Sequence, residues 1–160
     1  MRFSHTLRYE ATPAEVRAML TDPSFREKVC EAVHATRIDV SVDPGASGPT
    51  VVVDQTQPAR GIPSFAKRFV GDEIQIVQRE SWRSDTAARL TVDLPGKPGR
   101  FDGELDLQPD GTGTTETVTG DVEVKVPLVG GKLEGLVSDL LKAALNAEQR
   151  VGRAWLTTSR

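Results

Sequence analysis

The sequence predicts a single α+β domain, residues 1–160, in which a curved seven-stranded antiparallel sheet wraps around a long C-terminal helix. Seven segments alternate apolar and polar residues with the period of a strand. Most connections between the last six are short and rich in Gly, Pro and Asp, which suits antiparallel neighbours. From about residue 131 the apolar residues change to the three-and-four spacing of an amphipathic helix.

The opening strand is expected at residues 2–10, where apolar and polar residues alternate. Its inward face carries four alternate residues: Phe3, His5, Leu7 and Tyr9.

Two short helices should follow this strand. Residues 12–15 read Thr-Pro-Ala-Glu, the N-cap, first-turn proline and capping-box glutamate of a helix start. Thr-Asp-Pro at 21–23 interrupts that helix, and a second helix is expected at about 24–33. Its apolar side carries Phe25, Val29, Cys30 and Val33. Cys30 should pack as a small apolar residue, and the charged residues, Arg26 among them, should lie mostly on the other side.

Six more strands are expected, at 37–43, 50–57, 72–83, 87–94, 100–108 and 115–126. Asp110-Gly111 is a strong hairpin signal between the last two. Gly103 and Gly120 fall on inward phases, where they could be bend points of the curved sheet, line a cavity, or do both.

The terminal helix should face the sheet through an apolar stripe: Leu133, Leu136, Val137, Leu140, Ala144, Ala147, Val151 and Trp155. Seven strands make a sheet about 34 Å wide, whereas a helix is about 10–12 Å across. One helix cannot cover that face, so the sheet must curl around it, and the small inward residues favour a cavity between them.

Four polar residues fall on the predicted concave face: His5, Tyr9, Gln78 and Glu80. A buried, unpaired carboxylate costs several kcal/mol, so Glu80 needs a partner, water or a proton. It could lie near a hydrated mouth or pair with Arg60 or Arg83, while His5 and Tyr9 satisfy each other or the backbone. Alternatively these groups orient an amphipathic ligand, or the register of the strand slips by one residue.

The long connection at 58–71 interleaves apolar Ile62, Phe65 and Phe69 with basic residues. These three residues could form a lid over the cavity mouth, touch a membrane surface during ligand uptake, or pack on the rim of the sheet. Trp82 and Trp155 fall on inward phases and are either packing anchors or ligand stackers.

Composition argues against several functional classes. With 20 Lys and Arg against 23 Asp and Glu, the net charge of −3 provides no general field for nucleic acid. No stretch approaches the roughly 18 consecutive apolar residues of a membrane span, and the N-terminus lacks a signal-peptide core, so we expect a cytoplasmic protein without stable membrane insertion. One cysteine and two histidines provide few metal ligands. Phosphate loops, nucleophile elbows and dinucleotide fingerprints are missing, and no metal or cofactor is expected.

The order of elements resembles the helix-grip superfamily, which includes START lipid-transfer domains, the birch-pollen allergen group and the polyketide cyclase/dehydrase group. Residue-level support comes from the stretch ATPAEVRAMLTDPSFREKV, similar to the superfamily's strand, proline-capped helix, Asp-Pro break and second helix. Arg17 departs from it, because an aromatic residue often stands there. The stretch MRFSH to CEA is similar to an uncharacterised actinobacterial family within the superfamily. The resemblance implies a fold and a binding habit, not a reaction.

We therefore expect a protein that binds or carries a lipophilic or amphipathic small molecule between the sheet and the C-terminal helix, mainly by burying apolar surface. The predicted apolar wall is Leu7, Ile76, Leu90, Leu105, Val122, Leu136, Leu140 and Ala144. The orienting groups are His5, Tyr9, Gln78 and Glu80. A polyketide cyclase/dehydratase-like enzyme with Glu80 or His5 as acid/base, or a protein-interaction module, remain alternatives. The ligand, the choice between carrier and sensor, and the oligomeric state are left open.

Overall fold

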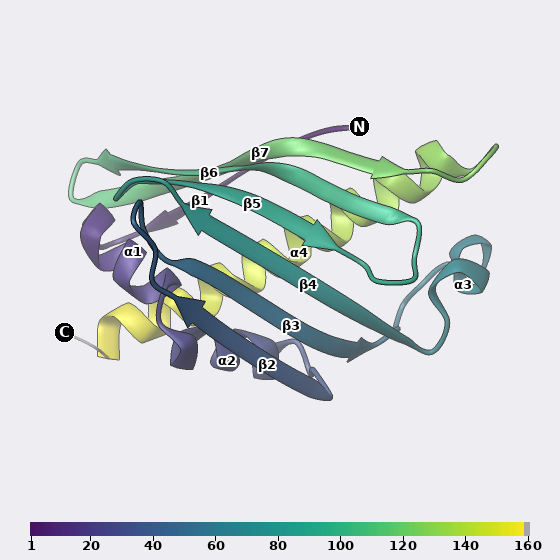
Figure 1. Ribbon diagram of the computed structural model, residues 1–160, viewed down its shortest axis with the longest axis horizontal. Helices are drawn as coiled ribbons and strands as arrows, with labels where there is room; N and C mark the ends of the chain where they lie inside the picture. The colour runs from purple at the N-terminus through teal and green to yellow at the C-terminus, as the bar shows by residue number, and fades with distance from the viewer. Residues whose placement is uncertain (159–160) are drawn as a thin grey trace.

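The computed structural model describes residues 1–158 and confirms the predicted helix-grip fold (Figure 1). The elements follow the expected order, with one addition, as β1 Arg2–Tyr9, α1 Pro13–Leu20, α2 Pro23–Ala32, β2 Arg37–Asp43, β3 Thr50–Pro58, α3 Ser64–Val70, β4 Glu73–Trp82, β5 Ala87–Asp93, β6 Gly99–Asp110, β7 Gly113–Val124 and α4 Gly130–Thr158.

All seven strands form one antiparallel sheet in the order β1-β7-β6-β5-β4-β3-β2. From β2 to β7 each strand pairs with the next along the chain, while β1 closes the far edge against β7. The predicted hairpin turn lies between β6 and β7, where Gly111 adopts a φ of 62°. The sheet curves over α4, which crosses behind it in Figure 1.

The two short helices begin as predicted. The Thr12 hydroxyl accepts from the Glu15 backbone N–H at 3.2 Å, and the Glu15 carboxylate accepts from the Thr12 N–H at 3.0 Å. Asp22 caps α2 by accepting from the Ser24 N–H at 2.8 Å. One expectation is wrong, because Arg26 lies on the buried side of α2 with 3% of its side chain exposed.

The inward face of α4 differs from the predicted stripe in its middle. Leu140 is 45% exposed and Ala144 is also exposed, whereas Leu145 is buried and Leu141 packs on the core. The buried side of α4 is therefore turned by about one residue from the predicted stripe, and it includes a charged residue, Glu148.

The connection at 58–71 contains the added helix, α3. Its Ala66 is fully buried in a second apolar cluster with Val124 and Leu133, and Ile62 and Phe69 pack against this cluster. Packing at the rim of the sheet, one of the three alternatives for this segment, is therefore present.

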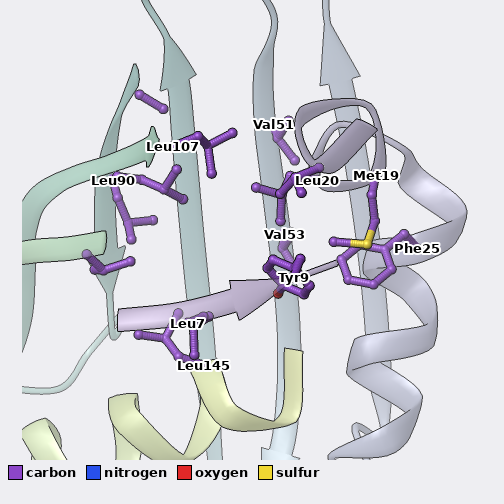
Figure 2. Packing of buried hydrophobic residues seen from close by; sticks show 14 of the residues in the cluster. Leu7, Tyr9, Met19, Leu20, Phe25, Val51, Val53, Leu90, Leu107 and Leu145 are labelled. Carbon is purple, nitrogen blue, oxygen red and sulfur yellow. The ribbon is translucent and has the colours of Figure 1, made fainter. Parts of the chain in front are cut away.

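The main core is densely filled (Figure 2). Tyr9 lies among Met19, Leu20 and Phe25, and α4 approaches its ring so closely at Gly152 that an added Cβ would come within 2.7 Å of Tyr9 Cε1. Of the two tryptophans, Trp155 packs edge-on against Phe25 with ring centroids 5.6 Å apart. Trp82 is 2% exposed within the core. Both positions fit packing anchors.

Gly103 and Gly120 face each other across β6 and β7, and the ring of Phe101 covers both. An added Cβ would meet Phe101 Cζ at 2.7 Å from Gly103 and 2.8 Å from Gly120. The alternative of a cavity lined by these glycines is therefore wrong, since an aromatic ring from the same sheet fills the space.

No helix in residues 1–158 is long and apolar enough to cross a membrane.

Candidate functional site between the sheet and the terminal helix

A small cleft of about 50 Å³ separates the concave face of the sheet from α2 and α4. It is lined by Arg26, Val29, Cys30, Val33, Val53, Gln55, Gln57, Gln78, Leu90, Val92, Leu141, Ala144, Leu145 and Glu148. Ligand pockets usually enclose about 300–1,000 Å³, whereas one water needs about 10–15 Å³. In this conformation the cleft has room for a few waters but not for a lipid chain. The space between the sheet and α4 is therefore smaller than the widths of a seven-stranded sheet and one helix predicted.

A larger hollow of about 370 Å³ lies near the end of α4 and is lined by Arg8, Glu10, Arg153, Leu156 and Thr157. It shares no lining residue with the interior cleft. Its walls are mostly charged and polar side chains of the surface. We place the candidate site at the interior cleft, because only there do apolar walls meet convergent buried polar groups.

Arg26 is the centre of these polar groups. Its Nε donates to the Leu20 carbonyl at 2.7 Å, and its Nη2 donates to Glu80 Oε2 at 2.5 Å. Its Nη1 lies 3.6 Å from Glu148 Oε2. Arg26, Glu80 and Glu148 come from α2, β4 and α4, and all three are buried. This ion-pair group ties the two helices to the sheet.

A third buried carboxyl, Glu116 of β7, leaves the group with more acid than base. Burial raises the pKa of Glu116 well above its ordinary value, and the charges of Glu148 and Glu80 raise it further. Burial likewise raises the pKa of Glu148 to about 7, although Arg26 opposes this. We call Arg26, Glu80, Glu116 and Glu148 the buried charge cluster. With a single cation, it favours a proton on Glu116 and leaves Glu148 to titrate near neutrality.

The cluster has unused capacity for hydrogen bonds. Within residues 1–158, neither carboxyl oxygen of Glu116 has a hydrogen-bond partner, and the same holds for Oε1 of Glu80 and Oε1 of Glu148. The buried hydroxyl of Tyr9 has none either, and burial, followed by the charge of Glu116, raises its pKa. Buried polar atoms are nearly always paired, so these atoms need partners from outside the chain, such as water or a ligand, or a bound proton.

Amide groups extend the polar wall along the sheet. Gln78 donates to Glu80 Oε2 at 3.0 Å, and Gln57 donates to Gln55 at 2.9 Å. Gln55, Gln57 and Gln78 all line the cleft. On the opposite wall, burial raises the pKa of the Cys30 thiol to about 11, so it presents a neutral S–H at neutral pH.

The structure distributes the predicted ligand-binding residues over several regions. Three line the cleft: Gln78, Leu90 and Ala144. Two belong to the polar interior: Tyr9 and Glu80. Three are in the filled core and do not reach the cleft: Leu7, Leu105 and Val122. Four lie outside both the cleft and the main core: His5, Ile76, Leu136 and Leu140.

Of these four, His5 is half-buried, and its Nε2 lies 2.8 Å from Asn146 Oδ1 in a hydrogen bond. Leu136 packs in the second apolar cluster, and the exposed side chain of Leu140 contradicts a place in the apolar wall. Neither Arg60 nor Arg83 is the partner of Glu80. Arg26 provides the charge instead.

Arg26, Glu116 and Glu148 are not among the site residues predicted from the sequence. For Glu116 the signal was present, because it has the same phase along its strand as the inward residues Val118 and Val122. Arg26 was expected on the outer side of its helix because it is charged, and Glu148 is absent from the predicted apolar stripe of the terminal helix for the same reason. Only the packing of three separate elements shows that their charges meet.

Residues 4–156 match the sequence profile of a family described as proteins of unknown function, DUF2505. The chain belongs to the DUF2505 family. Uncharacterized protein Rv0481c of Mycobacterium tuberculosis (strain ATCC 25618 / H37Rv) is 23% identical over 169 residues, which cover 98% of this chain and 97% of that protein. The resemblance to an uncharacterised family is thus confirmed.

Solved structures similar to this DUF2505 protein share its helix-grip fold. TTHA0849 from Thermus thermophilus superposes with a TM-score of 0.70 at 17% identity and covers 99% of both chains. The Zhui aromatase/cyclase from Streptomyces sp. R1128 has a TM-score of 0.66 at 12% identity, covering 98% of this chain and 93% of its own. A START superfamily protein from Mycobacterium smegmatis has a TM-score of 0.66 at 14% identity, covering 96% and 98%. At these identities the likeness establishes the fold alone.

Proposed function

We propose that this DUF2505 protein binds a small amphipathic molecule in the cleft between β3–β5, α2 and α4. The polar end of the ligand contacts the glutamine wall and the buried charge cluster. Its apolar part packs against Val29, Val33, Leu90, Val92, Leu141 and Leu145, all of which line the cleft. Burial of apolar surface, at about 25 cal/mol per Å², supplies most of the affinity.

The observation that carries this proposal is the unused hydrogen-bonding capacity beside the cleft. Buried charges are costly, and replacing such groups with apolar residues of similar volume is often neutral or stabilising. Stability therefore does not explain three carboxyls around one guanidinium. A ligand that brings hydrogen-bond donors would satisfy Glu148 Oε1, which has no partner among residues 1–158 and belongs to a residue that lines the cleft.

The charge balance of the cluster selects the polar end of the ligand. Arg26 is already engaged by Glu80, Glu148 and the Leu20 carbonyl. A carboxylate headgroup would add a further negative charge to a site where acids outnumber the base, at a cost that grows in a low dielectric. Hydroxyl, phenol, amide or amine groups fit instead, because they donate to carboxylate and glutamine oxygens.

Binding requires a wider cleft than about 50 Å³. The sheet wall is held by continuous ladders of backbone hydrogen bonds between neighbouring strands. The helical wall is held mainly by side-chain contacts, which cost less to rearrange. We therefore expect α2 and α4 to separate when a ligand enters, with the Arg26 to Glu148 contact of 3.6 Å as the point of opening.

Three ligands with one tail and different heads test the proposal: dodecylamine, dodecanol and dodecanoate, each measured by displacement of Nile red fluorescence above pH 7. We expect the amine and the alcohol to bind more tightly than the carboxylate. Glu148→Gln should narrow the gap between amine and carboxylate by removing a negative charge from the cleft wall. Arg89→Ala, on the outer face of the sheet, should leave the order unchanged. Tightest binding by dodecanoate, or no displacement by any of the three, would contradict the proposal.

Catalysis is a second candidate, favoured by one observation. Glu148 lines the cleft and has its pKa raised to about 7, mainly by burial, which suits a general acid or base at neutral pH. Glu80 is ion-paired with Arg26, and His5 is outside the cleft, so neither of the acid/base residues suggested by the sequence is as well placed. A cyclisation or dehydration assay on a polyketide-like substrate, with Glu148→Gln losing turnover but keeping binding, would support an enzyme.

The predicted lid of Ile62, Phe65 and Phe69 stays a prediction. No residue of 59–71 is among those that line the cleft. The cytoplasmic location also stays a prediction.

A further inference from the structure

Three segments meet at one end of the molecule: residues 59–71 with α3, the β5–β6 turn at 94–99, and residues 124–133 leading into α4. We call this surface the basic tip. The Lys125 N–H donates to the Pro98 carbonyl at 3.3 Å, and Ala66, Val124 and Leu133 form one buried cluster. In Figure 1 all three segments lie at the right-hand end, away from the β6–β7 hairpin.

Charge is strongly segregated to this tip. Its 29 residues contain six basic side chains and no Asp or Glu: Arg60, Lys67, Arg68, Lys97, Lys125 and Lys132. The rest of the chain holds the other 14 basic and all 23 acidic residues, a formal charge of −9. An overall acidic protein thus presents one strongly positive end.

Acidic residues at the borders of the tip neutralise little of this charge. Asp93 pairs with Arg100 at 3.1 Å, which lies outside the tip. Glu134 lies 3.7 Å from the N-terminal ammonium and accepts from the Val124 N–H. Glu123 faces one tip residue, Lys125, at 3.5 Å, and Asp72 follows the end of α3. Five of the six tip cations have no acidic partner within ion-pair distance among residues 1–158.

Leu128 projects from this positive end. Its side chain is 104% exposed, and its φ of 71° is one that bulky L-residues rarely adopt. The Val129 N–H donates to the Pro127 carbonyl at 2.9 Å, so Leu128 is the centre of a three-residue γ-turn of the strained, positive-φ kind. Residues with such backbone strain are enriched at functional sites.

A second apolar side chain accompanies it. Phe65 of α3 is 39% exposed, and Lys132 Nζ lies 6.0 Å from the centre of its ring. Apolar side chains that project beyond a ring of Lys and Arg are typical of proteins that lie on lipid surfaces, where the apolar groups enter the acyl boundary and the cations meet anionic headgroups.

We propose that the basic tip docks on an anionic lipid bilayer, with Leu128 and Phe65 inserted at the interface and the six basic residues against the headgroups. A protruding, fully solvated leucine fits a deformable medium such as a bilayer. The positive end of the α4 dipole, at Gly130, points to the same side. This surface is separate from the interior cleft, and its test does not depend on the function proposed there.

Flotation with vesicles tests this proposal on the full chain, comparing phosphatidylcholine alone with phosphatidylcholine plus phosphatidylglycerol. We expect binding only to the anionic vesicles, weakening as salt is added. Lys67→Glu with Arg68→Glu should lower the partition coefficient roughly 25-fold or more, since each basic residue near an anionic surface is worth about fivefold. The matched control, Arg79→Glu with Arg150→Glu, changes the net charge equally outside the tip and should bind like the wild type.

The variant Leu128→Gly tests whether a loss of vesicle binding can occur without a loss of stability. Glycine adopts the positive φ without a Cβ clash, and the exposed leucine side chain has no burial to lose, so thermal stability should be unchanged or higher. Vesicle binding should nevertheless fall several-fold. Binding to neither vesicle, equal binding to both, or a charge-reversed tip that binds like its control would overturn the proposal. A dimer in analytical ultracentrifugation that Leu128→Gly dissociates would also overturn it, because a second copy would then cover the tip.

Discussion

Charged residues on the two faces of this sheet follow different rules. On the outer face, exposed arginines pair with exposed carboxylates, as in Arg89–Asp102 at 2.8 Å and Arg83–Glu104 at 2.9 Å. Both pairs are roughly half exposed. Beneath the concave face, Arg26 of α2 contacts two carboxylates, Glu80 and Glu148, while the carboxyl of Glu116 has no hydrogen-bond partner among residues 1–158. All four side chains are buried.

The two groups of charges differ in what they cost the folded state in free energy: the exposed pairs cost little, and the buried cluster costs much more. Exposed pairs contribute about 0–1 kcal/mol and are screened by salt. Buried charges lose several kcal/mol of hydration each, so an unbalanced cluster lowers stability unless protons or ligands compensate. Four substitutions test this contrast, beginning with the largest expected effect.

Removing the cation of the buried charge cluster should cost most. Arg26→Met leaves Glu80 buried without its partner and leaves the Leu20 carbonyl without a donor. We expect a loss of about 3–5 kcal/mol in the free energy of unfolding, measured by urea denaturation at neutral pH. The double variant Arg26→Met with Glu80→Leu should recover most of this loss. A single variant as stable as the wild type would show that the buried pair is not coupled as its geometry indicates.

Glu148 should make stability depend on pH. Its pKa rises from an ordinary 4.5 to about 7 on folding, mainly through burial, so the folded state binds more protons between these values. The contribution of Glu148 is therefore fully present below about pH 4.5 and is lost as pH rises to about 7, a loss of about 3 kcal/mol. Glu148→Gln should flatten this part of the curve and be more stable than the wild type at pH 8. Parallel curves for the two proteins would contradict the assignment.

Replacing Glu116 with an apolar residue should stabilise the folded protein. Neither of its carboxyl oxygens has a hydrogen-bond partner among residues 1–158, and burial raises its pKa, so a neutral side chain costs no ion pair. We expect Glu116→Leu to raise the free energy of unfolding by about 1–2 kcal/mol, measured by thermal and chemical denaturation. Glu116→Gln, which keeps the shape and the polar atoms, is the control and should gain less. A destabilised Leu variant would show that the carboxyl has a partner in solution, water included.

The outer face should respond least. Arg89→Ala breaks the exposed pair with Asp102, and we expect the free energy of unfolding to change by less than about 1 kcal/mol, and less still in high salt. The comparison with Arg26→Met under the same conditions is the informative measurement. Equal losses from the two variants would remove the distinction between the two faces.

The fold was predictable because its signals are local. Alternation along each strand, the capping box at Thr12 and the hairpin at Gly111 all depend on residues that are neighbours in sequence. The helix at 64–70 was missed because seven residues bounded by Pro63 and Gly71, without a side-chain cap, carry too few turns for a clear period.

The candidate site was predictable only in part. The phase of β4 correctly placed Glu80 and Gln78 inside, and the need of a buried carboxylate for a partner followed from solvation alone. The identity of that partner did not follow, because Arg26 is 54 residues away in sequence and its charge suggested an outward position. The same bias moved the predicted stripe of α4 from Leu141 to Leu140.

By itself, the sequence determined the order of elements, the antiparallel pairing and the presence of polar groups inside the sheet, since each follows from periodicity and turn chemistry along the chain. Only the tertiary structure decided how much space remains and which charges meet there. The volume left between the sheet and the helices, and the balance of charge inside it, both depend on side chains from elements that are far apart in sequence. A ring such as Phe101 can fill the space that two glycines leave, and no local pattern records that contact.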